Sequence, residues 1–483
     1  MGIPSYYKKL IDTIPGLVSK GHKDIEWLFM DFNCLIYHCI DDSDETLFIE
    51  RIIAYCLKVI KHVNPRGVFI AIDGVVPMAK MKQQRLRRFK SALSQSTWDK
   101  NAITPGTVFM SKLKKSLEDM TSKHNWILSS SDEPGEGEHK IIAEWRKGTY
   151  TGNFAVYGLD ADLIVLSILG HECYSLKNIW LFREEVNVGK VAYDSFGEEI
   201  FNWFHINALK TWLSPDRAFI LNYCFAMSIL GNDFLPSSLG LKMRDDGHSE
   251  LLRIIKNLTL VNPSTLEISF DGILELFKIL LVNEPNRICR YICKKQMLAN
   301  TCGELNMGEN NWPLSHIEES VLLDKKQLCV NWQEKYHTFF DEPIHTLCKE
   351  YMKGIQWIWS YYTGKDVCFN WYYPYNLPPL WKWIYDYLLI HPLPVLDIVI
   401  RAVDIKPVEQ LSLVLPLQSW SLVPPGAERL IPKYAPQYYP ETFLFESIGK
   451  RYFWECEAMI PLPSILEIKE IIAFIKKRDN ILL

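Results

Sequence analysis

The chain has 483 residues, of which 48% are hydrophobic and 23% are charged, and these proportions are typical of a folded soluble protein. Its length allows two or three domains that share a large core. The formal net charge of −4 excludes binding to nucleic acid through a uniformly basic surface, so a nucleic-acid partner would need a local basic patch.

No segment of the sequence predicts a secretory signal or a membrane span. The N-terminal stretch MGIPSYYKKL lacks the apolar core of a signal peptide, and Tyr6 stands where a myristoylation motif needs Ser or Thr. The most apolar stretches, 219–231 and 379–403, contain polar or charged residues. We therefore expect buried helices there and no association with a membrane.

The cysteines are numerous but scattered. There are 12 of them without a C-x-x-C pair, which is typical of a reducing compartment, and we expect a cytoplasmic protein. The tightest group is Cys289, Cys293 and Cys302. Because most tetrahedral zinc sites have more closely spaced ligand pairs, zinc is the less favoured interpretation of this group.

Short apolar runs alternate with helix-like segments in the first half of the chain. We expect buried strands at 27–33, 67–74, 154–166 and 179–182. We expect helices at 45–63, at about 105–124 and at 138–147, with further helix at 204–231. This alternation predicts an α/β fold with a parallel, twisted, doubly wound sheet flanked by helices.

The composition divides the chain into two regions. The first region, 1–285, contains the predicted sheet. The pattern loosens at 286–330 into mixed polar and charged residues, which predicts a linker or loop. The second region, 331–483, is rich in Trp, Tyr and Pro, and we expect it to be mostly helical and packed on the first.

Seven acidic residues lie at predicted strand ends and turns: Asp31, Asp73, Glu136, Glu138, Asp160, Asp162 and Asp233. Asp31 and Asp73 belong to the sheet edge where open α/β sheets bind ligands. The E-G-E and D-A-D pairs suit non-helical stretches, in which residues two apart point to one side, roughly 6–7 Å from each other. Any single acid could instead be a helix cap, a turn residue or a solvated surface group.

Taken together, the acids predict a metal site. Several carboxylates in one crevice repel one another strongly unless cations neutralise them. Hard oxygen ligands in this number suit Mg²⁺ or Mn²⁺. Two such ions can activate a water and stabilise the leaving oxygen of a phosphodiester, so we expect two divalent cations.

A basic stretch, AKMKQQRLRRFK at 79–90, carries six Lys or Arg residues and no acid. If it is helical, four polar side chains fall within an arc of about 100°: Lys80, Gln84, Arg87 and Arg88. Arg and Lys in this arrangement suit a phosphate group. A solvated basic face or a localisation signal is the alternative. The stretch begins shortly after Asp73, which favours a pocket for a terminal phosphate beside the acids.

Several longer motifs occur in order over nearly the whole chain: MGIPSYY, DFN, AIDGVVPMAKMKQQRLRRFK, ITPGTVFM, EPGEGEHKI, YGLDADLIVL, FREE, GNDFLP, WYYPYN, EQLSLVLP and GKRYFWECEAMIPLP. Through this combination the sequence resembles the 5′→3′ exoribonucleases of the XRN type, in a short, cytoplasmic-like form made of the catalytic core. The resemblance implies a sheet of the PIN or flap-nuclease type.

The resemblance also implies roles for these residues. The seven acids would bind the two cations, with Asp31, Asp73 and Glu136 mainly around the first. The four residues of the basic arc would accept a 5′-monophosphate. The implied reaction is hydrolysis of the first phosphodiester of single-stranded RNA to release a nucleoside 5′-monophosphate, as in mRNA decay. The implied partners are RNA with a 5′-monophosphate and decapping or other RNA-decay factors.

The sequence departs from the family pattern at the base-stacking positions. Where the family usually has His six residues after the first acid, this chain has Tyr37, with His38 beside it. Where the family commonly has two Trp residues before its YYPY motif, Phe369 replaces the first and Trp371 stands at the second. We expect Tyr37, His38 and Trp371 to stack on bases, and the alternative for Trp371 is a core aromatic.

Two other functions stay open from the sequence. A flap-type endonuclease has a similar metal site, but the basic helix, the region 331–483 and the lack of a helix-hairpin-helix glycine pattern argue against it. A catalytically inactive module that binds RNA ends could have lost acids without losing its fold, whereas all seven are present.

Overall fold

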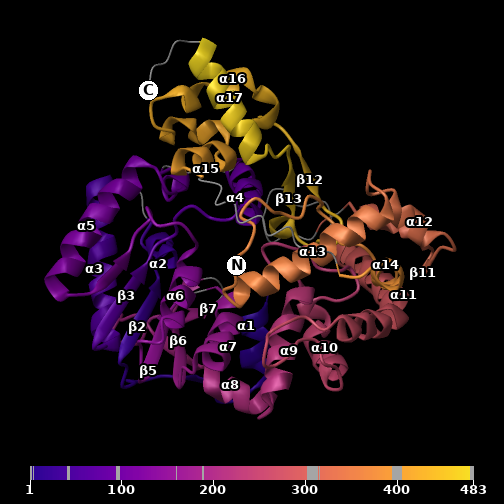
Figure 1. The fold of residues 1–483 in the computed structure, drawn as a ribbon, viewed down its shortest axis with the longest axis horizontal. Helices are drawn as coiled ribbons and strands as arrows, with labels where there is room; N and C mark the ends of the chain where they lie inside the picture. The colour runs from indigo at the N-terminus through magenta and orange to yellow at the C-terminus, as the bar shows by residue number, and fades with distance from the viewer. Residues whose placement is uncertain are drawn as a thin grey trace.

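A seven-stranded sheet forms the centre of the first region in the computed structural model (Figure 1). Its strand order is β1-β9-β6-β5-β2-β3-β4. The strands are Val18–Ser19 (β1), Trp27–Asp31 (β2), Gly67–Ala71 (β3), Ile127–Ser129 (β4), Asn153–Tyr157 (β5), Asn178–Glu184 (β6) and Phe201–His205 (β9). The strands β2 to β6 pair in parallel, whereas β9 runs antiparallel to β6 and β1. The predicted α/β fold is confirmed, and antiparallel strands extend its parallel centre at one edge.

The structure describes residues 3, 5–40, 44–93, 98–158, 160–187, 190–301, 314, 316–393 and 405–478. None of the helices in these ranges is both long and apolar enough to cross a membrane. Cys302 of the possible zinc group and the end of the apolar stretch 379–403, from residue 394 on, lie outside the described residues.

Helices cover both faces of the sheet, which explains why its central strands are apolar along their whole length. These helices are Tyr6–Thr13 (α1), Phe32–His38 (α2), Glu45–Val63 (α3), Met78–Ser91 (α4), Val108–His124 (α5), Gly137–Arg146 (α6), Asp162–Tyr174 (α7), Ile206–Leu213 (α8) and Arg217–Met227 (α9). On one face, α3 and α5 form a core with Leu28 and Val68. On the other face, α6 and α7 form a core with Phe29 and Phe69. The helices predicted at 45–63, 105–124 and 138–147 are confirmed with small shifts at their ends.

The strand predicted at 154–166 is wrong over its second half. The strand β5 ends at Tyr157 and α7 begins at Asp162. The residues of α7 from Asp162 to Gly170 are all buried. A helix buried on every side lacks the polar face that gives a helical periodicity, so its apolar run cannot be told from a buried strand.

The remaining helices build the second region and its connection to the sheet. They are Gly247–Ile255 (α10), Phe270–Thr301 (α11), Trp332–His337 (α12), Ile344–Tyr362 (α13), Trp381–Ile390 (α14), Pro407–Val414 (α15), Ile431–Tyr434 (α16) and Ile465–Arg478 (α17). A small hairpin pairs Leu444–Glu446 (β12) with Glu457–Met459 (β13). The expected mostly helical, aromatic-rich region is confirmed.

The linker predicted at 286–330 is wrong for residues 286–301, because α11 continues to Thr301. Ile288 and Ile292 lie one turn apart on α11 and are fully buried in the main core. Exposed charged residues of the same helix, such as Arg290 and Lys294, made this stretch look like a loop, although they belong to the exposed side of a half-buried helix. The division into two regions stays a prediction.

Helix α4 joins the two regions through its basic side chains. In Figure 1, α15 and α17 lie directly above α4, and α15 packs on it. Arg85 is fully buried, and its guanidinium donates to the carbonyl oxygens of Leu413 at 2.6 Å and Pro461 at 3.1 Å. Lys82 Nζ donates in the same way to the carbonyls of Tyr373 at 2.8 Å and Tyr375 at 3.1 Å.

Lys90 also donates to the backbone of the second region, since its ammonium group lies 2.9 Å from the Cys456 carbonyl oxygen. The charges of Lys82, Arg85 and Lys90 are therefore satisfied by backbone oxygens of the second region. The alternative of a fully solvated basic face is wrong for these three residues, and the second region fixes where α4 lies.

Glu284 on α11 holds the start of α14. Its carboxylate accepts hydrogen bonds from the backbone N–H groups of Trp381 at 2.7 Å and Lys382 at 3.1 Å. Burial raises the pKa of Glu284 from 4.5 to about 7. Between these pH values the folded chain keeps a proton that the unfolded chain has released, so the free energy of unfolding falls as the pH rises through this window. At about 1.4 kcal/mol per pKa unit, the loss is about 3 kcal/mol.

We predict that Glu284→Gln removes this part of the pH dependence, because an amide does not ionise. Urea unfolding of both proteins at about pH 4.5 and about pH 8 measures the effect. The wild-type free energy of unfolding should fall by about 2–3 kcal/mol more than that of the variant between the two pH values. Equal falls in both proteins would contradict the raised pKa.

Candidate active site

The predicted acidic and basic residues meet in one cavity of about 370 Å³ beside the carboxyl ends of β2 and β3. Six of the seven acids line it, and so do all four residues of the basic arc: Asp31, Asp73, Glu136, Glu138, Asp160, Asp233, Lys80, Gln84, Arg87 and Arg88. Asp162, the seventh acid, is buried at the start of α7 and does not line the cavity. The structure thus brings distant parts of the sequence together at the carboxyl ends of the strands, where open α/β sheets bind ligands.

Two neighbouring parallel strands position Asp31 and Asp73. Asp31 is the last residue of β2, and Asp73 follows β3, which pairs with β2. Asn33 Nδ2 donates to Asp73 Oδ2 at 3.0 Å, and the backbone N–H of Gly137 donates to Asp73 Oδ1 at 2.7 Å. These two hydrogen bonds fix the Asp73 carboxylate against the start of α6.

The E-G-E motif straddles the start of α6. Glu136 is the extended residue before the helix, with φ −70° and ψ 150°, and Glu138 lies in its first turn. A Cβ atom on Gly137 would lie 2.7 Å from Asp31 Oδ1, so only glycine lets the helix start come this close to Asp31. Gly135 has φ +108°, a conformation that L side chains rarely adopt.

The expectation that both acid pairs lie in non-helical stretches is therefore half wrong. Glu138 and Asp162 each belong to the first turn of a helix, while Glu136 and Asp160 precede one. In the first pair, Glu136 and Glu138 still point to one side of the start of α6. In the second pair, Asp160 lines the cavity and Asp162 does not. Acids are also favoured at the start of a helix by the unpaired N–H groups and the positive end of the helix dipole.

Burial and mutual repulsion disfavour the ionised form of most acids in the cluster. Burial raises the pKa of Asp31 well above its usual range, and Asp73 raises it further. Burial and then Asp162 do the same to Glu138, and burial and then Asp160 raise the pKa of Asp162 to about 7. Asp160 differs: burial raises its pKa, but positive charges that include Lys80 lower it more.

Lys80 of α4 supplies positive charge inside the cluster. Its ammonium group lies 2.6 Å from Glu136 Oε2 and 2.8 Å from Asp233 Oδ2, and its side chain is only 13% exposed. Burial lowers the pKa of Lys80, but Asp233 and then Glu136 raise it more, to well above its usual range. One ammonium group cannot neutralise this number of carboxylates, so the cluster needs further cations.

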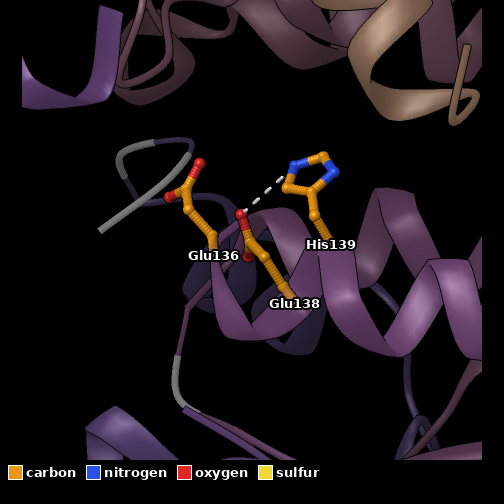
Figure 2. Close-up of side chains that lie close together, drawn as sticks. All are labelled: Glu136, Glu138 and His139. Carbon is orange, nitrogen blue, oxygen red and sulfur yellow. Dashed lines mark ion pairs between the residues drawn. The ribbon is translucent and has the colours of Figure 1, made fainter. Parts of the chain in front are cut away.

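The donor atoms fit divalent cations. Asp162 Oδ1 and His139 Nε2 are buried without a hydrogen-bond partner among the described residues. Figure 2 shows Glu136, Glu138 and His139 pointing to one side of the start of α6, and their ligand atoms lie within 4.8 Å of one another. Burial lowers the pKa of His139 well below its usual range, so its ring is neutral and can act as a ligand. A set dominated by carboxylate oxygens suits Mg²⁺ or Mn²⁺.

The basic arc lines the side of the cavity formed by α4. Arg88 is buried and donates from Nη1 to Thr104 Oγ1 at 2.6 Å. Burial lowers the pKa of Arg88 to about 10, which leaves it charged at neutral pH. Arg87 is exposed, and its guanidinium makes no hydrogen bond or ion pair within the described ranges. Gln84 is buried on the same helix and accepts a long hydrogen bond of 3.5 Å from Gln410.

The three predicted stacking residues have different surroundings. Tyr37 lines the cavity and is 40% exposed, so its ring is open to a ligand. His38 also lines the cavity, but its ring already stacks on Tyr55 at 4.4 Å and lies 3.3 Å from a carboxylate oxygen of Glu199. Trp371 does not line this cavity and packs against another tryptophan ring at 5.3 Å.

Sequence reasoning missed several side chains that support the site. Asn33 and His139 lie beside predicted acids, so their position in the motifs could have indicated them. Tyr361 donates from its hydroxyl to Glu136 Oε1 at 2.8 Å and stacks on His139 with ring centroids 3.5 Å apart. Thr104 lies in the motif ITPGTVFM, whose presence could have indicated it. Tyr361 has no local sequence signal, because folding alone brings it to the acids.

Comparisons with known proteins show which family the sequence is similar to. A family model described as XRN 5′-3′ exonuclease N-terminus matches residues 1–97 and 91–185, and one described as Xrn1 helical domain matches residues 331–477. The chain is 28% identical to 5′-3′ exoribonuclease 1 of Homo sapiens, over 95% of this chain and 33% of that protein. It is 24% identical to 5′-3′ exoribonuclease 1 of Schizosaccharomyces pombe, over 95% of this chain and 47% of that protein.

A third relative is 5′-3′ exoribonuclease 2 of Candida albicans, at 22% identity over 100% of this chain and 73% of that protein. The chain therefore spans a third to about half of the length of the first two relatives. Among solved structures, a flap endonuclease of bacteriophage T5 in complex with DNA and metal ions gives a TM-score of 0.32 at 13% identity, over 56% of this chain and 92% of that chain. A score this low supports no conclusion about this chain.

We predict that Lys80→Ala destabilises the metal-free protein more than the protein in excess Mn²⁺. Without metal, the loss of Lys80 leaves Glu136 and Asp233 buried without their counter-charge, at a cost of about 3–5 kcal/mol. Bound cations would neutralise the same carboxylates and reduce that cost. Thermal unfolding in EDTA and in Mn²⁺ measures the difference.

Lys82→Ala is the matched control, because Lys82 lies on the same helix and donates to carbonyl oxygens of Tyr373 and Tyr375. Its effect on the unfolding temperature should be the same in EDTA and in Mn²⁺. If Lys80→Ala also lost equal stability under both conditions, the exchange of Lys80 for metal would be rejected.

Proposed function

Because the chain belongs to the XRN family of 5′-3′ exonucleases, we propose that it is a metal-dependent 5′→3′ exoribonuclease. The observation that carries the proposal is that one cavity holds both the acid cluster and the basic arc. Acids alone would suit many metal-dependent hydrolases. A phosphate pocket beside them selects a substrate whose terminal phosphate lies close to the bond that is cut.

The proposed substrate is single-stranded RNA with a 5′-monophosphate. Lys80, Gln84, Arg87 and Arg88 would bind the terminal phosphate, with Arg88 held in place by Thr104. A cap or a triphosphate adds bulk and charge that a pocket closed by α4 would have to accommodate. Rejection of the wrong end is therefore part of the proposed specificity.

The seven acids are the proposed holders of two divalent cations, Mg²⁺ or Mn²⁺. Asp31, Asp73 and Glu136 would hold mainly the first, and the other four acids the second. When bound, the cations supply an activated water and neutralise charge on the leaving oxygen.

The chain's own residues prepare this site. Asn33 and the Gly137 N–H hold Asp73 in one orientation, and Tyr361 does the same for Glu136. Lys80 pairs with Glu136 and Asp233. Lys80 would be free to contact the substrate phosphate where other positive charge neutralises Glu136 and Asp233, so binding of metal and binding of substrate would favour each other.

Each cut would release a nucleoside 5′-monophosphate and leave a new 5′-phosphate on the shortened strand. The product end therefore has the same chemistry as the substrate end, and the strand can advance by one nucleotide. Enzymes that remove caps would generate suitable ends. We accordingly propose decapping or other RNA-decay factors as partners and the cytoplasm as the location.

We predict that the protein degrades one RNA sequence only when its 5′ end is a monophosphate. The same RNA with a hydroxyl or a triphosphate end should persist, because the basic arc is matched to a single phosphate. Products resolved by length in the presence of Mg²⁺ should be mononucleotides. Internal fragments from all three RNAs would instead identify an endonuclease and overturn the assignment of the basic arc.

Asp162→Asn is the matched catalytic control, since it keeps the shape of the side chain and removes one negative charge. The rate should fall on the order of 1,000-fold, which corresponds to several kcal/mol of lost transition-state stabilisation. Wild-type protein that binds the monophosphate RNA in Mg²⁺ without cutting it would identify an inactive end-binding module.

We predict that Tyr37 stacks on a base near the cut. Tyr37→Ala should lower kcat/KM by about 5- to 150-fold, since stacking contributes about 1–3 kcal/mol per base. Tyr37→Phe keeps the ring and should stay within about twofold of the wild type. Steady-state kinetics on the monophosphate RNA distinguish the two variants, and similar losses in both would point to the hydroxyl group and away from stacking.

A further inference from the structure

A second cavity, of about 470 Å³, lies against a different face of α4. Lys82, Gln83 and Leu86 line it from α4, whereas Lys80, Gln84 and Arg88 line the acid cavity. Arg87 and Asp233 line both cavities. A ligand that extends past Arg87 and Asp233 from the acids therefore continues directly into the second cavity.

Basic side chains outnumber acidic ones in the lining of the second cavity, whose acids are Asp233, Glu455 and Glu457. Lys450 makes no side-chain hydrogen bond or ion pair in the part of the chain that the structure describes. Lys242 donates to the neutral hydroxyl of Ser237 at 3.0 Å. Burial, and next the charge of Lys450, lowers the pKa of Lys242 to about 7. Two ammonium groups that repel each other across a cavity indicate a site for an anion.

Two other basic side chains that line the cavity already form ion pairs with acids. Arg244 lies 3.0 Å from a carboxylate oxygen of Glu455, and Arg451 pairs with Asp245. The open positive charge is thus concentrated at Lys242, Lys450 and the exposed Arg87. Lys242 and Lys450 are half-buried in the lining of the cavity, whereas the lysines of an ordinary solvated basic face are exposed.

Aromatic rings complete the lining. Tyr291, Tyr372 and Tyr375 face the cavity, and Trp454 lies at it with 41% of its surface exposed. The Arg244 guanidinium lies 4.9 Å from the Trp454 ring. Cations interleaved with aromatic rings are typical of proteins that bind single-stranded nucleic acid, with phosphates on the cations and bases on the rings.

We propose that the second cavity binds the single-stranded RNA on the 3′ side of the cut, with a backbone phosphate at Lys450 and Lys242. This inference rests on the proposed function and adds the path of the strand to it. The continuity through Arg87 and Asp233 favours a strand over a free nucleotide, because only a strand would occupy both cavities at once. The cavity holds the strand in place while the acids cut its first bond.

The test compares two 5′-monophosphorylated RNAs, a dinucleotide and a 15-nucleotide strand, on Lys450→Glu. The dinucleotide fills only the acid cavity. The KM for the long strand should rise on the order of 10-fold in the variant, while kcat for both RNAs and KM for the dinucleotide stay unchanged. The slope of log KM against log salt for the long strand should become shallower by about 0.7 for each phosphate that the variant no longer binds.

Two further variants make the result specific. Lys450→Gln removes the charge without reversing it and should give a smaller rise in KM for the long strand. Lys115→Glu makes the same charge reversal on the exposed face of α5, remote from both cavities, and should leave both RNAs unaffected. Circular dichroism and unfolding temperature confirm that each variant is folded.

Several outcomes would overturn the inference. They are an unchanged KM for the long strand, an equal rise for both RNAs, and weakened binding of a free nucleoside 5′-monophosphate, which would identify a nucleotide site. Fluorescence anisotropy of the labelled long strand in EDTA gives a readout that needs no hydrolysis. If the wild-type protein cuts neither RNA but Lys450→Glu binds the long strand more weakly than the wild type, the result would support the strand-binding cavity and reject the exonuclease function.

Discussion

The mutual repulsion of buried carboxylates is the constraint on which the rest of this structure depends. Burial raises the pKa values of Asp31, Glu138 and Asp162, and the neighbouring acids raise them further. Such a cluster is stable only where positive charge is built around it. The sheet edge gathers the acids, the starts of α6 and α7 contribute the positive ends of their dipoles, and Lys80 contributes an ammonium group.

Helix α4 explains why the site needs the whole chain. Its acid-facing side carries Lys80 and Arg88, while Arg85 on another side is tied to carbonyl oxygens far along the sequence. The direction in which Lys80 points is therefore fixed by contacts made with residues 413–461. The first region without the second would keep the acids but lose the support that holds their counter-charge. The position of Lys80 therefore depends on contacts from both regions.

The sequence could predict the parts of the site that depend on short-range chemistry. Apolar strands followed by Asp31 and Asp73 indicated the sheet edge, and the spacing of the basic arc indicated one face of a helix. Glu138 and Asp162 were placed wrongly because a helix can begin inside an i, i+2 pair, and no local pattern marks that residue. The helix at 286–301 was missed because its exposed side resembles a loop in composition.

Contacts made across the fold were beyond reach of the sequence. Tyr361 reaches Glu136 from 225 positions away, and nothing in its neighbourhood distinguishes it from the other tyrosines of α13. Base stacking by Trp371 stays a prediction: its motif position suggested a stacking surface, and its half-buried ring packs on Trp357. Local patterns report which chemistry is available, whereas long-range packing decides which side chains are free to use it.

The net charge of −4 is an average over two neighbouring cavities of opposite charge. The acid cavity is negative wherever cations are absent, and the second cavity is positive around Lys242 and Lys450. A polyanion approaching the acids alone would be repelled, so the proposed binding of RNA would depend on the flanking positive charge on both faces of α4. Arg87 and Asp233 stand where the two cavities meet. The alternation of positive, negative and positive charge along one path is suited to a strand of phosphates that must be held on both sides of a single cut.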